Sequence, residues 1–203
     1  MKKDIYTVGY VGFRIEDFVA AIKRVGIDFV IDVRSVARSM YFAAFNEKNL
    51  SKVLATEGIA YRNLKDEFGA RQEDEIYYTD GYLDFEKFAV SVAFMGGIKA
   101  VEELTDAGKS VCLMCAEKDP LNCHRAALCG KEFSHRGFEV LHIVPVKGDV
   151  VIERQSDLEK RLVGLYFKGG FCGGDLFGED MCENLLEQSY KKHNKKIGFR
   201  PKK

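Results

Sequence analysis

The residue types best suited to chemistry are gathered in one segment, Cys115-Ala-Glu-Lys-Asp-Pro-Leu-Asn-Cys123-His124-Arg125. The apolar residues 111–115 predict a strand that ends at Cys115, and residues 123–136 predict a helix after a short turn. The free amides at the start of a helix and the helix dipole attract anions, and Arg125 would add a planar, permanently charged group. The segment therefore predicts a binding site for an anionic or nucleotide-type ligand.

The same positive field would lower the pKa of a nearby thiol, because positive charge stabilises the thiolate. Cys115 or Cys123 is then a candidate nucleophile, and His124 or Glu117 is a candidate acid or base. In the alternative interpretation both cysteines are small packing residues and Arg125 pairs with a carboxylate. The sequence leaves open whether the site is catalytic.

Soft ligands for a metal ion also occur here, at Cys112, Cys115, Cys123 and His124. Residues 112 and 115 lie on the expected strand, where an odd separation points two side chains to opposite faces. The adjacent residues 123 and 124 are expected to diverge in the same way on the helix. We therefore assign no metal site from the sequence, and the sequence identifies no cofactor.

Alternating strands and helices must position this segment. Strand-like apolar runs occur at residues 4–9, 29–33, 59–64, 111–115 and 139–144. Segments with helical periodicity separate these runs, which predicts an α/β fold with a three-layer, mostly parallel sheet flanked by helices. Residues 65–82 are expected to form a long loop, and Gly96-Gly97 to break the helix that begins near Phe85.

Open parallel sheets bind ligands beyond the carboxyl ends of their strands. This rule adds Tyr10, after the first strand, and Asp32-Val33-Arg34, at the end of the second, to the predicted site. Arg34 is a candidate second anion ligand with Asp32 orienting it, and the alternative is a purely structural ion pair. His142, late in the last expected strand, is more typical of a core histidine than of a catalyst.

The composition changes after residue 145. We expect residues 1–145 to form the α/β domain, and residues 146–203 to form a C-terminal extension with a glycine-rich segment, a short helix near 179–193 and a basic tail. The glycine-rich residues 169–178 lack the Lys-Ser/Thr of a phosphate-binding loop, so we interpret them as a flexible connection. The net charge is zero, but residues 191–203 carry seven Lys or Arg and no acid. This tail favours an alternative function, the binding or processing of nucleic acid.

The composition also bounds the class of protein. The 203 residues are 46% hydrophobic and 31% charged, which is typical of a globular domain. No run approaches the roughly 20 apolar residues that a membrane helix needs, and no signal-peptide pattern follows the first residues. We therefore expect a cytoplasmic protein that does not enter the membrane, with its six cysteines reduced.

Several short motifs together resemble the domain of unknown function 488 (DUF488) family. The matching pieces are Thr7-Val-Gly-Tyr10, Asp32-Val-Arg34, Phe45-Asn46, Gly58-Ile-Ala-Tyr61, Cys115-Ala-Glu117, Cys123-His-Arg125 and Leu141-His-Ile143. The resemblance implies the fold and the positions of the site residues over about residues 4–145, but it implies no reaction. The middle of the chain departs from the family pattern, with Phe68-Gly-Ala70 in place of the usual Leu-Gly-Gly. A Cys-dependent enzyme, a nucleic-acid function and a non-catalytic structural module remain as alternatives.

Overall fold

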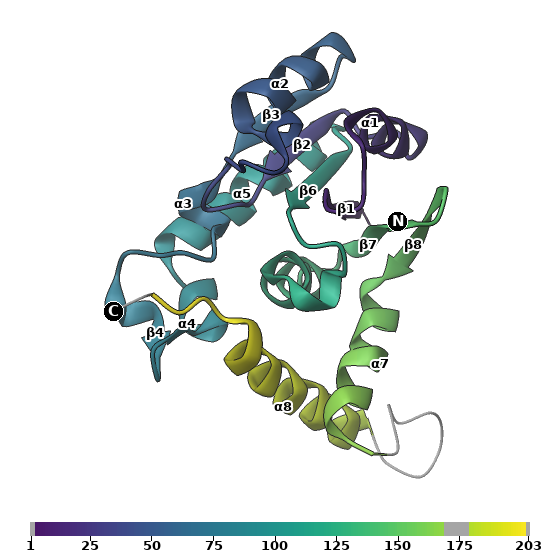
Figure 1. Ribbon diagram of the computed structural model, residues 1–203. Helices are drawn as coiled ribbons and strands as arrows, with labels where there is room; N and C mark the ends of the chain where they lie inside the picture. The colour runs from purple at the N-terminus through teal and green to yellow at the C-terminus, as the bar shows by residue number, and fades with distance from the viewer. Residues whose placement is uncertain (1–2, 169–178, 202–203) are drawn as a thin grey trace.

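The computed structural model describes residues 3–168 and 179–201. The expectation of a flexible connection at residues 169–178 lies outside these described residues. Six strands form one sheet in the order β3-β2-β6-β1-β7-β8 (Figure 1). Their bounds are β1 Asp4–Gly9, β2 Phe29–Asp32, β3 Ala60–Asn63, β6 Val111–Cys115, β7 Glu139–Val146 and β8 Asp149–Arg154.

The first five of these strands are mutually parallel, which confirms the predicted α/β class. The sixth strand, β8, is antiparallel to β7 and was not predicted. Its residues, Asp149-Val-Val-Ile-Glu-Arg154, stay largely exposed, and its apolar run is only three residues long, shorter than the run of about four to eight residues that indicates a buried strand. The sheet therefore ends in an edge strand contributed by the C-terminal extension.

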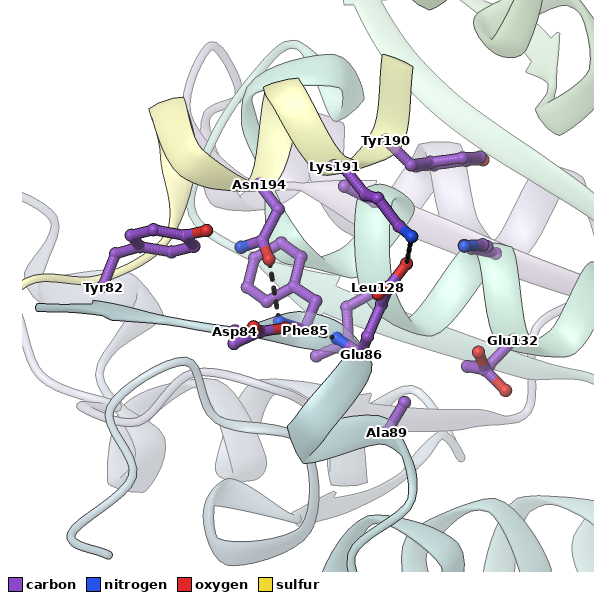
Figure 2. A pocket seen from close by; sticks show the side chains of 12 residues that line it. Tyr82, Asp84, Phe85, Glu86, Ala89, Leu128, Glu132, Tyr190, Lys191 and Asn194 are labelled. Atoms are coloured by element: carbon purple, nitrogen blue, oxygen red, sulfur yellow. Dashed lines mark hydrogen bonds and ion pairs between the residues drawn. The ribbon is translucent and has the colours of Figure 1, made fainter. Parts of the chain in front are cut away.

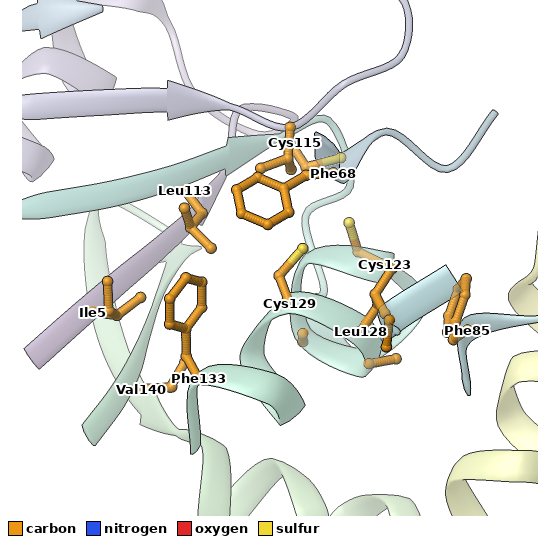
Figure 3. Packing of buried hydrophobic residues seen from close by; sticks show 14 of the residues in the cluster. Ile5, Phe68, Phe85, Leu113, Cys115, Cys123, Leu128, Cys129, Phe133 and Val140 are labelled. Carbon is orange, nitrogen blue, oxygen red and sulfur yellow. The ribbon is translucent and has the colours of Figure 1, made fainter. Parts of the chain in front are cut away.

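Helices cover both faces of the sheet and create two hydrophobic clusters. On one face, α1 (Ile15–Arg24) and α2 (Glu47–Thr56) pack against side chains such as Val30 and Cys112. On the other, α5 (Val92–Asp106), a π-helix (Arg125–Gly130) and α6 (Lys131–His135) contribute to the cluster that contains Leu113. Figure 3 shows Phe133 of α6 near Leu113 of β6 in this cluster. β6 is buried at every position, and its side chains alternate between the two clusters, with Leu113 in one and Cys112 in the other.

The predicted helix break at Gly96-Gly97 is wrong. The break lies at Ser91, between α4 (Phe85–Ala89) and α5, where the Ser91 side chain accepts a hydrogen bond from the Phe94 amide. Gly97 lies inside α5, and a Cβ there would approach the Phe68 ring to 2.9 Å. The glycine thus serves close packing rather than helix termination.

The predicted long loop contains short elements. These are α3 (Lys65–Phe68), a 3-10 turn (Glu75–Tyr77) and a small hairpin of β4 (Tyr78–Thr79) and β5 (Tyr82–Leu83). Phe68 is fully buried against α5 and anchors the segment to the core. The segment is therefore an ordered part of the wall above the sheet edge.

The C-terminal extension packs against the rest of the chain. It contains β8, α7 (Gln155–Tyr166) and α8 (Glu179–Ile197), so the last helix runs beyond the expected residue 193. Asn194 of α8 accepts a hydrogen bond from the Phe85 amide and donates one to the Leu83 carbonyl. These contacts place the end of α8 beside the β4–β5 hairpin (Figure 1). No helix among the described residues is long and apolar enough to span a membrane.

Candidate functional site

A cavity of about 280 Å³ lies beyond the carboxyl ends of β1, β2 and β6, which are neighbours in the sheet. The structure brings six of the predicted site residues to its lining: Tyr10, Arg34, Cys115, Glu117, Cys123 and His124. The parallel strand order explains the convergence, because these residues follow different strands that end at one edge. We call this space the edge cavity.

Two sulfurs, an imidazole and a carboxylate meet at the floor of the edge cavity. The Cys115 and Cys123 thiols donate to the same Glu117 Oε2, at 3.0 and 2.9 Å. His124 Nδ1 lies 4.0 Å from the Cys115 sulfur and 3.9 Å from the Cys123 sulfur. Figure 3 shows Cys115 at the end of β6 facing Cys123 across the strand-to-helix turn.

The expected divergence of residues 123 and 124 on a helix is wrong. Cys123 has extended backbone angles, φ −137° and ψ 139°, and His124 begins the helical region at φ −60° and ψ −22°. This change of backbone conformation turns both side chains toward the end of β6. The other sequence argument holds: Cys112 packs in the cluster on the opposite face of the sheet and does not join Cys115.

The imidazole of His124 has a defined orientation. Its Nε2 lies 3.0 Å from the Val33 carbonyl oxygen, which can only accept a hydrogen bond. In the neutral ring Nε2 therefore carries the proton, and Nδ1 presents a lone pair to the two sulfurs. A hydrogen bond of this kind commonly orients an imidazole for a specific chemical role.

The close contacts at the floor of the edge cavity shift the pKa values of these groups in different directions. Burial opposes ionisation of Cys123, but the adjacent Cys115 thiol, the positive charge of Arg125 and contact with His124 lower the pKa of Cys123 well below its usual value. The adjacent Cys123 sulfur and burial raise the pKa of Cys115. Desolvation of its inner side and the nearby Cys123 sulfur raise the pKa of Glu117, although much of that residue is exposed. Cys123 is therefore the more acidic thiol.

Arg125 lies elsewhere than the sequence analysis expects. Its side chain is fully buried and does not line the edge cavity. The guanidinium donates to the Glu117 and Lys118 carbonyls at 2.6 and 3.2 Å, and to Thr7 Oγ1 at 3.3 Å. Gly9 makes room for this turn, since a Cβ there would lie 1.7 Å from the Glu117 carbonyl oxygen. Arg125 thus holds the Cys115–Cys123 turn against β1.

A chain of buried hydrogen bonds continues from Arg125. Thr7 Oγ1 lies 2.7 Å from His142 Nδ1, and His142 Nε2 lies 2.8 Å from the Gln155 amide oxygen. Because that oxygen only accepts, His142 carries its proton on Nε2, and the Thr7 hydroxyl donates to Nδ1. Burial, together with the charge of Arg125, lowers the pKa of His142 to about 3. His142 is therefore a neutral core residue, and Gln155 donates onward to Tyr190 of α8 at 2.7 Å.

Arg34 and Asp32 form a buried ion pair at the side of the edge cavity. Arg34 Nη2 and Nε bond the carboxylate at 2.6 and 2.8 Å, and Nη2 also donates to the Phe45 carbonyl. Tyr61 donates to the same carboxylate, while the Arg34 guanidinium lies over the Tyr10 ring at 5.1 Å. Arg34 Nη1 is buried and has no hydrogen-bond partner within residues 3–168 and 179–201. Asp32 therefore orients a guanidinium that retains one donor group.

Sequence reasoning missed part of the cavity wall. Ser35 and Arg71 line it from the loops after β2 and α3, and Ile197 and Phe199 line it from the end of the chain. The Arg71 guanidinium lies over the Phe199 ring at 5.0 Å. Phe199 lies outside the family motifs, and its local sequence does not indicate that it lines the cavity, because the packing of α8 brings it there.

The basic tail makes several contacts with acidic neighbours. Lys191 lies 3.6 Å from Glu86, and Lys195 lies 3.9 Å from Asp80. The Lys191–Glu86 pair borders a second cavity, between α4, α8 and the π-helix (Figure 2). Among the residues that the structure describes, no cysteine or histidine lines that second cavity, so the edge cavity is the stronger candidate for a functional site. Nucleic-acid binding through residues 191–203 stays a prediction.

Comparison with known proteins gives a family and no activity. No curated protein and no solved structure matches the chain. The family model described as "Domain of unknown function DUF488" matches residues 14–131, which is more than half of the chain and includes the Cys115–Arg125 segment. The chain therefore belongs to the DUF488 family.

Proposed function

We propose that the edge cavity binds a small anionic molecule of the phosphate or nucleotide class beside a centre of two thiols, an imidazole and a carboxylate. Arg34 carries this proposal. A guanidinium that is buried, fixed by an ion pair and left with an unpartnered Nη1 is costly unless a ligand uses it. Arg34 therefore supplies the anchoring charge for the ligand.

The rest of the cavity supports the same ligand class. Arg71 adds a second guanidinium, and Tyr10 and Phe199 add aromatic rings. Aromatic faces next to cationic groups suit a phosphate joined to a planar ring. The volume of about 280 Å³ is near the lower limit for small-molecule sites, which favours a compact ligand.

The reactive groups lie where a bound ligand would meet them. Cys115, Cys123, His124 and Glu117 line the same cavity as Arg34. An anion held at Arg34 would thus lie next to groups that can bind a metal ion, attack an electrophile or move a proton. This juxtaposition supports an enzymatic role over a purely structural one.

Calorimetric titration with inorganic phosphate and a nucleoside monophosphate tests the proposal. Arg34→Lys keeps a positive charge beside Asp32 but removes the planar donor group, so affinity should fall roughly tenfold or more for a lost hydrogen bond to a charged group. Arg71→Ala should also weaken binding. Arg38→Ala is the matched control, because Arg38 is exposed and does not line the cavity.

Two outcomes would overturn the proposal. One is that the folded wild-type chain binds none of these anions. The other is that the folded Arg34→Lys variant binds them as the wild type does. Either result would favour the structural-module alternative, in which Asp32 and Arg34 only brace the sheet edge.

A further inference from the structure

We propose that Cys115, Cys123 and His124 bind a divalent metal ion of the zinc class at the floor of the edge cavity, with Glu117 at the fourth position. The inference rests on the proposed function, which places the reactive centre and the bound anion in one cavity. It deepens that function by naming what the two thiols and the imidazole do together.

The geometry is that of a ligand set. The two sulfurs and His124 Nδ1 all lie within 4.8 Å of one another. A tetrahedral zinc site with bonds of about 2.3 Å to sulfur and 2.0 Å to nitrogen separates its ligand atoms by roughly 3.6 Å. The sulfur-to-nitrogen distances of 3.9 and 4.0 Å need to shorten only slightly around an ion.

The surroundings of His124 match a metal ligand. Metal-binding histidines usually donate their second ring N–H to a carbonyl or carboxylate, which fixes the ring and bares the other nitrogen. His124 Nε2 has such a partner in the Val33 carbonyl, at 3.0 Å. Its Nδ1 is left to face the sulfurs, where no carbonyl or carboxylate hydrogen-bonds to it among the described residues.

The groups around the sulfurs stabilise negative charge. The Arg125 amide donates to the Cys123 sulfur at 3.4 Å, and the buried Arg125 guanidinium is nearby. Two thiolates and the Glu117 carboxylate packed within hydrogen-bond distance would repel one another strongly in a partly buried site. A divalent cation relieves that repulsion, and each thiol loses its proton to solvent when the metal binds.

The donor types select the class of ion. Thiolate and imidazole ligands favour Zn²⁺ and related transition metals over Mg²⁺ and Ca²⁺, which prefer oxygen. Three protein ligands beside a cavity are characteristic of zinc sites that keep an open or exchangeable position. Glu117 Oε2 lies at that position, within 3.0 Å of both sulfurs, so a bound anion could exchange with it.

Cobalt titration of the full-length, reduced, chelator-treated chain tests the site. We expect one equivalent of Co²⁺ to produce thiolate-to-cobalt charge transfer and the visible bands of tetrahedral cobalt, and Zn²⁺ to remove both. Cys123→Ala and His124→Ala should lower cobalt affinity at least tenfold. Cys112→Ala is the matched control, since Cys112 is equally buried but on the opposite face of β6.

A second measurement uses only the wild type. Zn²⁺ should protect Cys115 and Cys123 from alkylation, as located by peptide mass spectrometry. Equal alkylation with and without Zn²⁺, no charge-transfer band, or an unchanged band in folded Cys123→Ala would each overturn the metal site.

Phosphate titration of metal-free and Zn²⁺-loaded protein separates the two proposals. Phosphate binding without cobalt binding would refute the metal site and leave the proposed function intact. Cobalt binding without any anion binding would refute the proposed function and leave the metal site intact.

Discussion

Thr7 lies at the centre of the buried network that holds the site in place, so its hydroxyl can be tested by Thr7→Val. The side chain is fully buried, and valine has nearly the same shape. The substitution removes the acceptor of Arg125 Nε and the donor to His142 Nδ1. Arg125 Nε and His142 Nδ1 would then remain buried without a hydrogen-bond partner.

The expected effect follows from these two losses. Each buried polar group left without a hydrogen bond costs about 1–3 kcal/mol, so the free energy of unfolding should fall by about 4 kcal/mol in total. Urea denaturation followed by circular dichroism measures this change through the midpoint at an unchanged slope. Thr56→Val is the matched control, because Thr56 is exposed and bonds only to a carbonyl of its own helix; it should change stability by less than about 0.5 kcal/mol.

A loss below about 1 kcal/mol for Thr7→Val would refute the account of this network. It would mean that Arg125 and His142 find other partners, and that the Cys115–Cys123 turn does not depend on Thr7. A loss as large in Thr56→Val would show that the effect comes from valine itself.

Three further predictions concern the same region. The pKa of His142 is about 3 in the folded chain and about 6.5 when unfolded, so only the unfolded chain takes up this proton as pH falls below 6.5. The free energy of unfolding should therefore drop by up to ~1.4 kcal/mol per pH unit in that range, and His142→Gln should flatten this slope in urea titrations at pH 7 and pH 5. Gly9→Ala should prevent correct folding, because its Cβ would overlap the Glu117 carbonyl, whereas Gly96→Ala, inside a helix with free space, should raise the melting temperature slightly. Phe199→Ala should weaken nucleotide binding more than phosphate binding in calorimetry, because Phe199 offers the cavity an aromatic face and no charge.

The sequence predicts the central part of the fold because its strands carry continuous apolar runs. The strands at residues 29–33 and 111–115 are buried on both faces, and their parallel order then brings Arg34 and Cys115 to one edge. β8 escapes prediction because an exposed edge strand needs no apolar run. The end of α8 reaches the site only through tertiary packing, so Phe199 could not be assigned from local pattern.

The chemical roles were harder to predict than the positions. Arg125 follows the motif cysteine and carries the right charge for an anion ligand. Its actual partners are the Glu117 and Lys118 carbonyls and Thr7 Oγ1, and no local pattern indicates that the two carbonyl oxygens turn inward. The convergence of Cys123 and His124 likewise depends on one extended residue before the π-helix, which helical periodicity does not reveal.

Anomalous scattering from selenate, a phosphate-like anion, tests the central claim that the edge cavity is an anion site. Crystals of the full chain soaked in selenate should show a selenium peak in the edge cavity, placed so that an oxygen of the selenate accepts a hydrogen bond from Arg34. Selenate bound only elsewhere on the protein, with the edge cavity occupied by water, would contradict the account.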